Sequence, residues 1–265
     1  MNARLGEVRL ATFNILHGRS PADDVVDLDR FGAAVTLLDA DVLALQEVDR
    51  DQPRSHGADL TAVAADAMGA PEHRFVATLA GTPELWSAAT GELQPNAAGY
   101  GIALLSRHPV STWRAMALPA LPGPVPVVFP GRRRPVLVHD EPRAAVAAVL
   151  ELPGGPMTVV ATHLTFVPGW NAHQLRRLVR LLRSAPRPVV LMGDLNLTGR
   201  TPARLTGWRA LADGPTFPVQ EPDKQLDHIL GDGDLGPAAE GGSVDLGLSD
   251  HRALRVRLPH MSTDR

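Results

Sequence analysis

Residues 188–196 read Pro-Val-Val-Leu-Met-Gly-Asp-Leu-Asn, an apolar run that ends in a carboxylate and an amide. A short apolar run bounded by turn residues is typical of a strand buried on both faces. Because alternate side chains of an extended segment point the same way, Asp194 and Asn196 are expected to project into one site. We interpret them as a carboxylate that holds or deprotonates a water molecule and an amide that fixes it. The structural alternative is an Asx turn that closes the strand.

Five further polar clusters are placed in the same way, each at the end of a short apolar run or just after it. They are Thr12-Phe13-Asn14, Gln46-Glu47, Thr162-His163-Leu164, Leu226-Asp227-His228 and Ser249-Asp250-His251. A strand that runs on into a carboxylate, an amide or an imidazole brings that group to the rim of a sheet. The six clusters therefore predict one active site assembled from distant segments. The chemistry that they indicate is metal-assisted hydrolysis of a phosphate ester.

The apolar periodicity predicts a mixed α/β protein. Strands are expected at 8–14, 42–45, 75–79, 101–106, 144–152, 157–162, 188–192, 225–230 and 252–258, and helices after Asp27, at 59–68 and at 170–183. Long loops are expected between Leu79 and Gly101 and over 114–142. Early strands alternate with helices and later ones are joined by tight turns, which favours two mixed sheets packed face to face with helices outside.

Composition indicates an ordinary globular protein. The chain has 265 residues, of which 44% are hydrophobic and 21% charged. No internal repeat or linker divides it, so we predict a single domain over 1–259 and a frayed tail over 260–265. The absence of cysteine excludes disulfides, thiolate metal sites and a thiol nucleophile. No segment resembles a signal peptide or a membrane span, so a cytoplasmic protein without stable membrane insertion is expected.

Charge bears on the class of substrate. The net charge of −3 argues mildly against a general nuclease, because non-specific affinity for DNA scales with the number of neutralised phosphates. The run Arg132-Arg133-Arg134 and the arginines of the helix at 170–183 fit a solvated surface better than a nucleic-acid groove. Because this argument is mild, nucleic acid remains an alternative substrate. No pattern in the sequence indicates an oligomeric state.

Three oxygen-bearing side chains are candidates for a metal site. Glu47 and Asp250 supply carboxylates and Asn14 supplies an amide oxygen. Mg²⁺ prefers oxygen ligands in octahedral geometry and keeps several positions for water and substrate. We therefore expect Mg²⁺ as the cofactor, and Mn²⁺ is compatible with the same ligands.

Three basic side chains are candidates for work on the phosphate. His251 is a candidate general base, and either Asp250 or Asp227 can accept its second N–H. His163 can donate to an oxygen of the phosphate in the transition state. Arg143 can pair with the phosphate through two N–H groups, a surface salt bridge being the alternative.

The ordered set of segments resembles the endonuclease/exonuclease/phosphatase superfamily of deoxyribonuclease I-like hydrolases. The matching segments are Thr12-Phe-Asn-Ile, Leu45-Gln-Glu-Val, Gly101-Ile-Ala-Leu-Leu-Ser, Thr162-His-Leu, Gly193-Asp-Leu-Asn, Leu226-Asp-His-Ile and Ser249-Asp-His. The resemblance implies a four-layer α/β/β/α sandwich with the site at one end of the two sheets. It places the metal at Asn14 and Glu47 with Asp250 close by, and the attacking water at Asp194 and Asn196. It also implies that Asp227 orients His251 and that His163 stabilises the transition state.

Substrate is left open by these residues. We expect a Mg²⁺-dependent phosphoesterase that acts on a small or lipid-derived phosphate ester, by in-line attack of an activated water. The single lysine, Lys224, argues against highly phosphorylated inositols. A DNA endonuclease or exonuclease is the first alternative, and a binding module that has lost turnover is the second.

Overall fold

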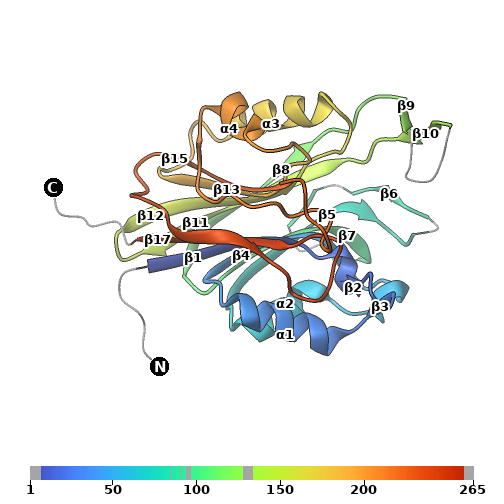
Figure 1. The fold of residues 1–265 in the computed structure, drawn as a ribbon, viewed down its shortest axis with the longest axis horizontal. Coiled ribbons are helices and arrows are strands. Elements are labelled where there is room, and N and C mark those ends of the chain that lie inside the picture. Colours follow the sequence, from blue (N-terminus) through green and yellow to red (C-terminus); the bar gives the residue numbers. More distant parts are fainter. Residues whose placement is uncertain (1–6, 84, 90, 94–96, 128–133, 260–265) are drawn as a thin grey trace.

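Two β-sheets lie face to face between two pairs of helices in the computed structural model, which describes residues 7–83, 85–89, 91–93, 97–127 and 134–259 (Figure 1). The first sheet has the order β16 (Ala239–Val244), β17 (Ala253–Pro259), β1 (Glu7–Asn14), β4 (Val42–Arg50), β7 (Gly99–Ser106), β5 (Glu72–Ala80) and β6 (Ser87–Ala88). The second has the order β14 (Arg209–Ala210), β15 (Asp227–Asp232), β13 (Val189–Asp194), β12 (Gly155–His163), β11 (Arg143–Leu152) and β8 (Val110–Leu118). The predicted α/β/β/α sandwich of two mixed sheets is confirmed.

The helices cover the outer faces of the sheets. Figure 1 shows α1 (Leu28–Leu38) and α2 (Leu60–Met68) on the seven-stranded sheet, and α3 (Trp170–Leu181) and α4 (Thr201–Thr206) on the six-stranded sheet. Asp27 caps α1 by accepting a hydrogen bond from the Arg30 amide, and Asp59 caps α2 in the same way. None of the described helices is both long and apolar enough to cross a membrane.

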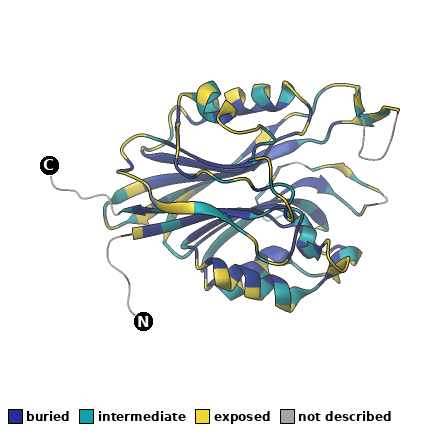
Figure 2. Cartoon of the chain, viewed as in Figure 1, coloured by how far each residue is buried: buried dark blue, intermediate teal, exposed yellow. Residues whose placement is uncertain are grey.

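Three apolar clusters hold the four layers together, so that the central strands are buried on both faces while the helices expose their outer sides (Figure 2). The central cluster lies between the two sheets and includes Leu10, Leu104, Val146, Val159 and Met192. The other two pack α1 and α2 against one sheet and α3 against the other. Burial of apolar surface at about 25 cal/mol per Å² makes this packing the main source of stability.

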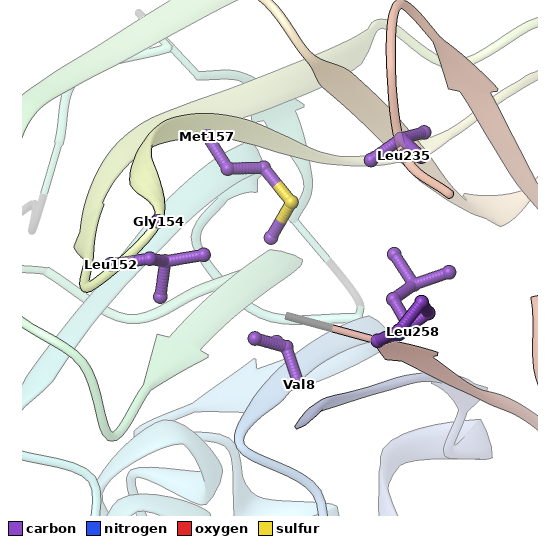
Figure 3. A pocket seen from close by; sticks show the side chains of 7 residues that line it. Val8, Leu152, Gly154, Met157, Leu235 and Leu258 are labelled. Carbon is purple, nitrogen blue, oxygen red and sulfur yellow. The ribbon is translucent and has the colours of Figure 1, made fainter. Parts of the chain in front are cut away.

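Apolar side chains fill the end of the sandwich that holds the start of β1. There Val8, Met157, Leu235 and Leu258 converge between the sheets around a cavity of about 10 Å³, close to the size of one water molecule (Figure 3). Its lining is mainly apolar, and a cavity of this size is too small to bind an organic ligand.

The opposite end collects the polar clusters, but not all of them arrive as predicted. Asn14, His163 and Asp194 are the last residues of β1, β12 and β13, as expected. In contrast, Asp227 begins β15 and His251 precedes β17, so the prediction that every cluster follows a strand was wrong. Both strands are antiparallel to their neighbours β13 and β1, so their starting ends reach the same rim.

Several predicted boundaries also differ. The strand expected over 42–45 continues as β4 to Arg50, because a bulge between Gln46 and Val48 keeps both halves paired with β7. The segment expected to be irregular over 114–142 contains the end of β8 and a hairpin of β9 (Pro124–Val127) and β10 (Val136–His139). Short elements were missed as well, namely β6, β14, β16, α4 and the pair β2 (Arg19–Ser20) and β3 (Val25–Val26).

Two predictions concern residues outside the described part of the chain in whole or in part. The frayed tail over 260–265 lies outside it, as do Arg132 and Arg133 of the arginine run. Arg134 is described and is exposed, as a solvated surface requires.

Gly193 tests the close pairing of β12 and β13. A Cβ at this position would lie 1.9 Å from the Thr162 carbonyl oxygen, so Gly193→Ala should force the strands apart and lower the free energy of unfolding by about 2–4 kcal/mol. Gly32→Ala on α1 is the control, because its Cβ would lie 3.8 Å from that of Ala67; it should change stability by less than about 1 kcal/mol. Denaturant unfolding followed by circular dichroism measures both. Equal stability of the two variants would refute the argument.

Candidate active site

Side chains from both sheets meet at the open end of the sandwich. The seven-stranded sheet contributes Asn14 from the end of β1 and Glu47 from the middle of β4. The six-stranded sheet contributes Arg143, His163, Asp194 and Asp227 from β11, β12, β13 and β15. Hydrogen bonds or close polar contacts connect these residues with one another and with Asn196 and His251, and Asp250 adjoins them next to His251.

Asn14 joins the two sheets. Its Nδ2 donates to Glu47 Oε1 at 3.1 Å and to Asp194 Oδ2 at 3.2 Å, while its Oδ1 accepts from the Leu16 amide at 3.2 Å. Asn14 is 1% exposed, so these bonds are shielded from water. In this arrangement the amide bridges two carboxylates that would otherwise repel each other.

Glu47 is directed into the site by a backbone irregularity. It is the extra residue of the bulge in β4 and has φ 58°, in the left-handed region that non-glycine residues rarely adopt. Without the bulge, Glu47 and Asp49 would lie on one face of a regular strand; Asp49 instead pairs with Arg54 at 2.7 Å and 2.8 Å. Strained backbone of this kind is common at functional sites.

His251 and Asp227 form a buried pair. His251 Nδ1 lies 2.8 Å from Asp227 Oδ2, and the two side chains are 7% and 0% exposed. The other ring nitrogen, Nε2, lies 3.8 Å from Asp194 Oδ2. Of the two partners that were open for His251, the structure thus places Asp227 against its ring, whereas for Asp250 the only side-chain hydrogen bond found among the described residues is with Ser249 at 3.5 Å.

Ser249 holds the segment that carries Asp250 and His251. Its hydroxyl donates to the Asn14 carbonyl oxygen at 2.6 Å and accepts from the His251 amide at 3.1 Å. Ser249 has φ 66°, so the chain turns sharply here. The start of β17 is thereby fixed to the end of β1.

Asp194 and Asn196 meet through a turn and not through an extended strand. Asn196 has φ 50°, and its amide donates to Asp194 Oδ1 at 2.9 Å, which is the Asx turn weighed against a functional role. The expectation that both side chains project from one extended segment was therefore wrong, because asparagine tolerates the left-handed region. The two side chains nevertheless reach the same place, since Asn196 Nδ2 lies 3.4 Å from His163 Nε2 and His163 Nε2 lies 3.5 Å from Asp194 Oδ2.

Arg143 stands next to His163. Its Nη1 lies 3.5 Å from His163 Nδ1 and its Nη2 lies 3.5 Å from Glu141 Oε2. Arginine can only donate, so we assign the hydrogen of the imidazole to Nε2, which also faces the Asp194 carboxylate at 3.5 Å. Arg143 is 6% exposed, and its Nε has no hydrogen-bond partner among the described residues. A buried guanidinium with unused donors is suited to an anion that enters the site.

Burial and neighbouring charges shift the pKa values of the site. Burial raises the pKa of Asp194 to about 7, with a contribution from Asp227. Burial alone would lower the pKa of His251, but Asp227, together with Asp194 and Asp250, raises it to about 10. For His163, burial and then Arg143 hold the pKa well below its usual value, so this imidazole is neutral at pH 7. Perturbed pKa values gathered in one place are typical of a catalytic site.

The chemistry of the donors fits a hard divalent cation. Burial, and then the charge of Asp250, raise the pKa of Glu47, so a cation between these carboxylates would relieve a real electrostatic cost. Asn14 completes an all-oxygen set if its amide turns over to present Oδ1 in place of Nδ2. A second group, Asp194, Asp227 and His251, has ligand atoms within 4.8 Å of one another. Its imidazole is already hydrogen bonded to Asp227, so the oxygen set is better suited to a hard divalent cation.

Four residues near the site were not identified from the sequence. Phe217 packs on His251 with ring centroids 4.9 Å apart, and Thr216 accepts hydrogen bonds from the Asp227 and Leu226 amides. Asn171 donates to the Asn196 carbonyl oxygen at 2.8 Å. Tyr100 is the chain's one tyrosine, and burial followed by the charge of Glu47 raises its pKa well above the usual value. Only the rarity of tyrosine was a signal in the sequence.

Comparisons with known proteins agree with this architecture. The profile of the Endonuclease/Exonuclease/phosphatase family matches residues 11–251. No curated protein sequence is significantly similar to that of the chain. Among solved structures, an endonuclease/exonuclease/phosphatase from Beutenbergia cavernae superposes with a TM-score of 0.66 at 24% identity, covering 96% of this chain and 72% of its own.

Two further structures carry printed activities. Sphingomyelinase C from Streptomyces griseocarneus superposes with a TM-score of 0.63 at 15% identity, and the Bacteroides thetaiotaomicron mannosyl-6-phosphatase with 0.61 at 14%. Each comparison covers 95% of this chain and 99% of the other. At these identities the likeness concerns the fold. The family profile, which spans nearly the whole chain and every candidate site residue, shows that the chain belongs to the Endonuclease/Exonuclease/phosphatase family.

Proposed function

We propose that the chain is a Mg²⁺-dependent phosphoesterase that hydrolyses a small or lipid-derived phosphate ester. The observation that carries the proposal is the connected, buried cluster of Asn14, Asp194, Asp227, His163 and His251, with Glu47 and Arg143 beside it. In this cluster each step of phosphate-ester hydrolysis has a side chain able to perform it. Membership of a family of nucleases and phosphatases agrees with this chemistry.

The attacking water is held by Asp194 and Asn196. The Asp194 carboxylate accepts a hydrogen bond from the water and the Asn196 amide fixes its orientation, which brings an otherwise diffusing nucleophile into line with the phosphorus. The surrounding carboxylates keep His251 protonated when no cation is bound, and a cation beside Asp250 would lower the pKa of His251. Its Nε2, 3.8 Å from Asp194 Oδ2, would then take the proton of the water. Asp227 holds the ring of His251 from behind and stabilises its positive charge.

The phosphate is bound from the side of the six-stranded sheet. Arg143 offers its unused N–H groups to phosphate oxygens, and neutral His163 donates from Nε2. Both side chains are at most 6% exposed, so their interaction with the charge that develops in the transition state is weakly screened.

Asn14, Glu47 and Asp250 would hold the metal. A bound Mg²⁺ would polarise the phosphate and stabilise charge on the oxygen of the departing alcohol. Around it, Glu47 and Asp250 would supply negative charge. Asn14 would supply its amide oxygen and give up the Nδ2 hydrogen bonds to Glu47 and Asp194 that it makes without the metal.

A panel of substrates tests the function. Release of phosphate or alcohol should be seen from small or lipid-derived esters with Mg²⁺ and abolished by EDTA. The panel would include lysophospholipids, sphingomyelin, sugar phosphates, nucleotides, inositol phosphates, plasmid DNA and an abasic duplex. Nicking of DNA at enzyme levels that leave small esters intact would instead identify a nuclease. Metal binding measured by calorimetry without turnover of any panel member would favour a binding module.

Glu47→Gln tests the metal site. Loss of one carboxylate should raise the Mg²⁺ concentration needed for half-maximal activity by about 10- to 100-fold. Glu141→Gln removes the same charge from a neighbouring, half-exposed position and should leave that concentration unchanged. Metal titrations of activity and calorimetric Mg²⁺ binding provide two readouts. An unchanged titration for Glu47→Gln would remove this residue from the metal site.

His251→Ala tests the transfer of the proton. The variant should lower kcat by a factor on the order of 10² to 10⁴ with little change in Mg²⁺ affinity. Asp227→Asn should lower kcat as well, because the amide cannot hold the ring in the same protonation state. His173→Ala is the control, since this histidine is exposed and stacks on Trp170 away from the cluster. Full turnover in a folded His251→Ala protein would contradict the assignment.

A further inference from the structure

A pocket of about 250 Å³ adjoins the candidate active site, with Arg143 as the shared wall. The described residues around it come from β5, β8, β11, α3 and the segments next to these strands. Those that are neither arginine nor threonine are Ala77, Ala89, Gly91, Ala117, Leu118, Pro119, Pro142 and Ala144. A pocket of this volume is slightly smaller than most ligand sites for small molecules, which span about 300–1,000 Å³. It can therefore hold only a compact organic group.

Arg143 faces both the pocket and the catalytic cluster. Its two side-chain contacts, to His163 and Glu141, are both 3.5 Å long, and its Nε has no partner among the described residues. The Arg143 guanidinium is 6% exposed and makes few hydrogen bonds. Its burial is unfavourable, because each N–H without a partner has lost its hydrogen bond to water. An anion at this position would recover that cost.

Arg177 brings a second positive charge to the same pocket. It lies on α3 one turn after Gln174, whose Nε2 donates to the Pro119 carbonyl oxygen at 3.0 Å. Trp170 Nε1 donates to the same oxygen at 3.1 Å, so the helix is held firmly against the end of β8. Arg177 is exposed, and within the described part of the chain no acidic side chain pairs with it.

The charges of the pocket all have one sign. Of the described residues that line it, two are arginines and none carries a carboxylate. Apart from Thr78, the other described residues of the lining are apolar, and five of them are alanine or glycine. A ligand that matches this lining has a short apolar body and a negative group that can reach Arg177 while its phosphate remains at Arg143.

We propose, resting on the proposed function, that this pocket binds the organic group of the substrate and that this group carries a second anionic centre. The substrate class is then a compact phosphate ester of an alcohol that also carries an acidic group. That group is a carboxylate or a second phosphate. Arg143 binds the phosphate that reacts, and Arg177 binds the distal anion and sets specificity. Long uncharged lipid chains are excluded by the volume.

Esters of graded length test the pocket. Phosphate monoesters and p-nitrophenyl phosphodiesters of ω-hydroxy carboxylic acids, with two to six carbons, would each be compared with the alkyl ester of the same length. The wild-type protein should prefer the carboxylated ester by about tenfold in kcat/KM at the best length, which is the effect of one charge-assisted hydrogen bond. In Arg177→Gln this preference should disappear, chiefly through KM, while kcat/KM for the alkyl esters stays the same.

Two further variants separate the pocket from general charge and shape. Arg176→Gln removes the same charge from the adjacent exposed position, which does not line the pocket, and should keep the preference. Ala117→Leu narrows the pocket at an exposed residue of β8 and should reduce activity on the longer esters more than on the shortest. An equal loss in Arg176→Gln and Arg177→Gln, or no preference in the wild-type protein, would overturn the proposal.

Calorimetric binding of the free ω-hydroxy carboxylates keeps the two proposals apart. Binding that is weakened by Arg177→Gln, without hydrolysis of any ester, would support the pocket and reject the phosphoesterase. Hydrolysis of alkyl and carboxylated esters at equal rates, without binding of the free acids, would support the phosphoesterase and reject the pocket.

Discussion

Face-to-face packing of the two sheets is the constraint on which the rest of the structure depends. The apolar cluster between them sets the spacing of strand ends that belong to different sheets. Asn14 from one sheet reaches Asp194 from the other at 3.2 Å, a contact that a shift of about 1 Å would break. The geometry of the candidate site is thus set by apolar side chains that do not themselves belong to it. The opposite end of the same core is lined by apolar side chains, among them Val8, Met157 and Leu258.

Strained backbone at this rim is supported by that core. Glu47, Asn196 and Ser249 all have positive φ values, and each costs on the order of 1–3 kcal/mol in a non-glycine residue. The surrounding hydrogen bonds hold them in place, such as that from Ser249 to the Asn14 carbonyl oxygen. The strain directs side chains that a regular strand would send elsewhere. The free energy gained by packing the core therefore offsets the cost of positioning side chains that do not themselves stabilise the fold.

The sequence allowed the sandwich, most strands and the convergence of the polar clusters to be predicted, because apolar runs and strand-end residues are local signals. The bulge at Glu47 was not predictable, since it depends on pairing with β7, a distant segment. Nor was the turn at Asn196, where a local hydrogen bond competes with the extended conformation. The contribution of Arg177 to a pocket was missed for a third reason: the helical pattern shows only that this face is polar, whereas packing on Pro119 determines what it faces.

The pairing of β17 with β1 determines when, during folding, the candidate site is complete. This last strand pairs with β1, and Ser249 bonds to Asn14 across a separation of 235 residues. Contacts so distant in sequence form late, since the entropy of closing the loop has to be overcome first. Asp250 and His251 enter the site only with that strand. A nascent or partly folded chain would thus lack the assembled site. The activity proposed above would arise only when the tertiary structure is complete.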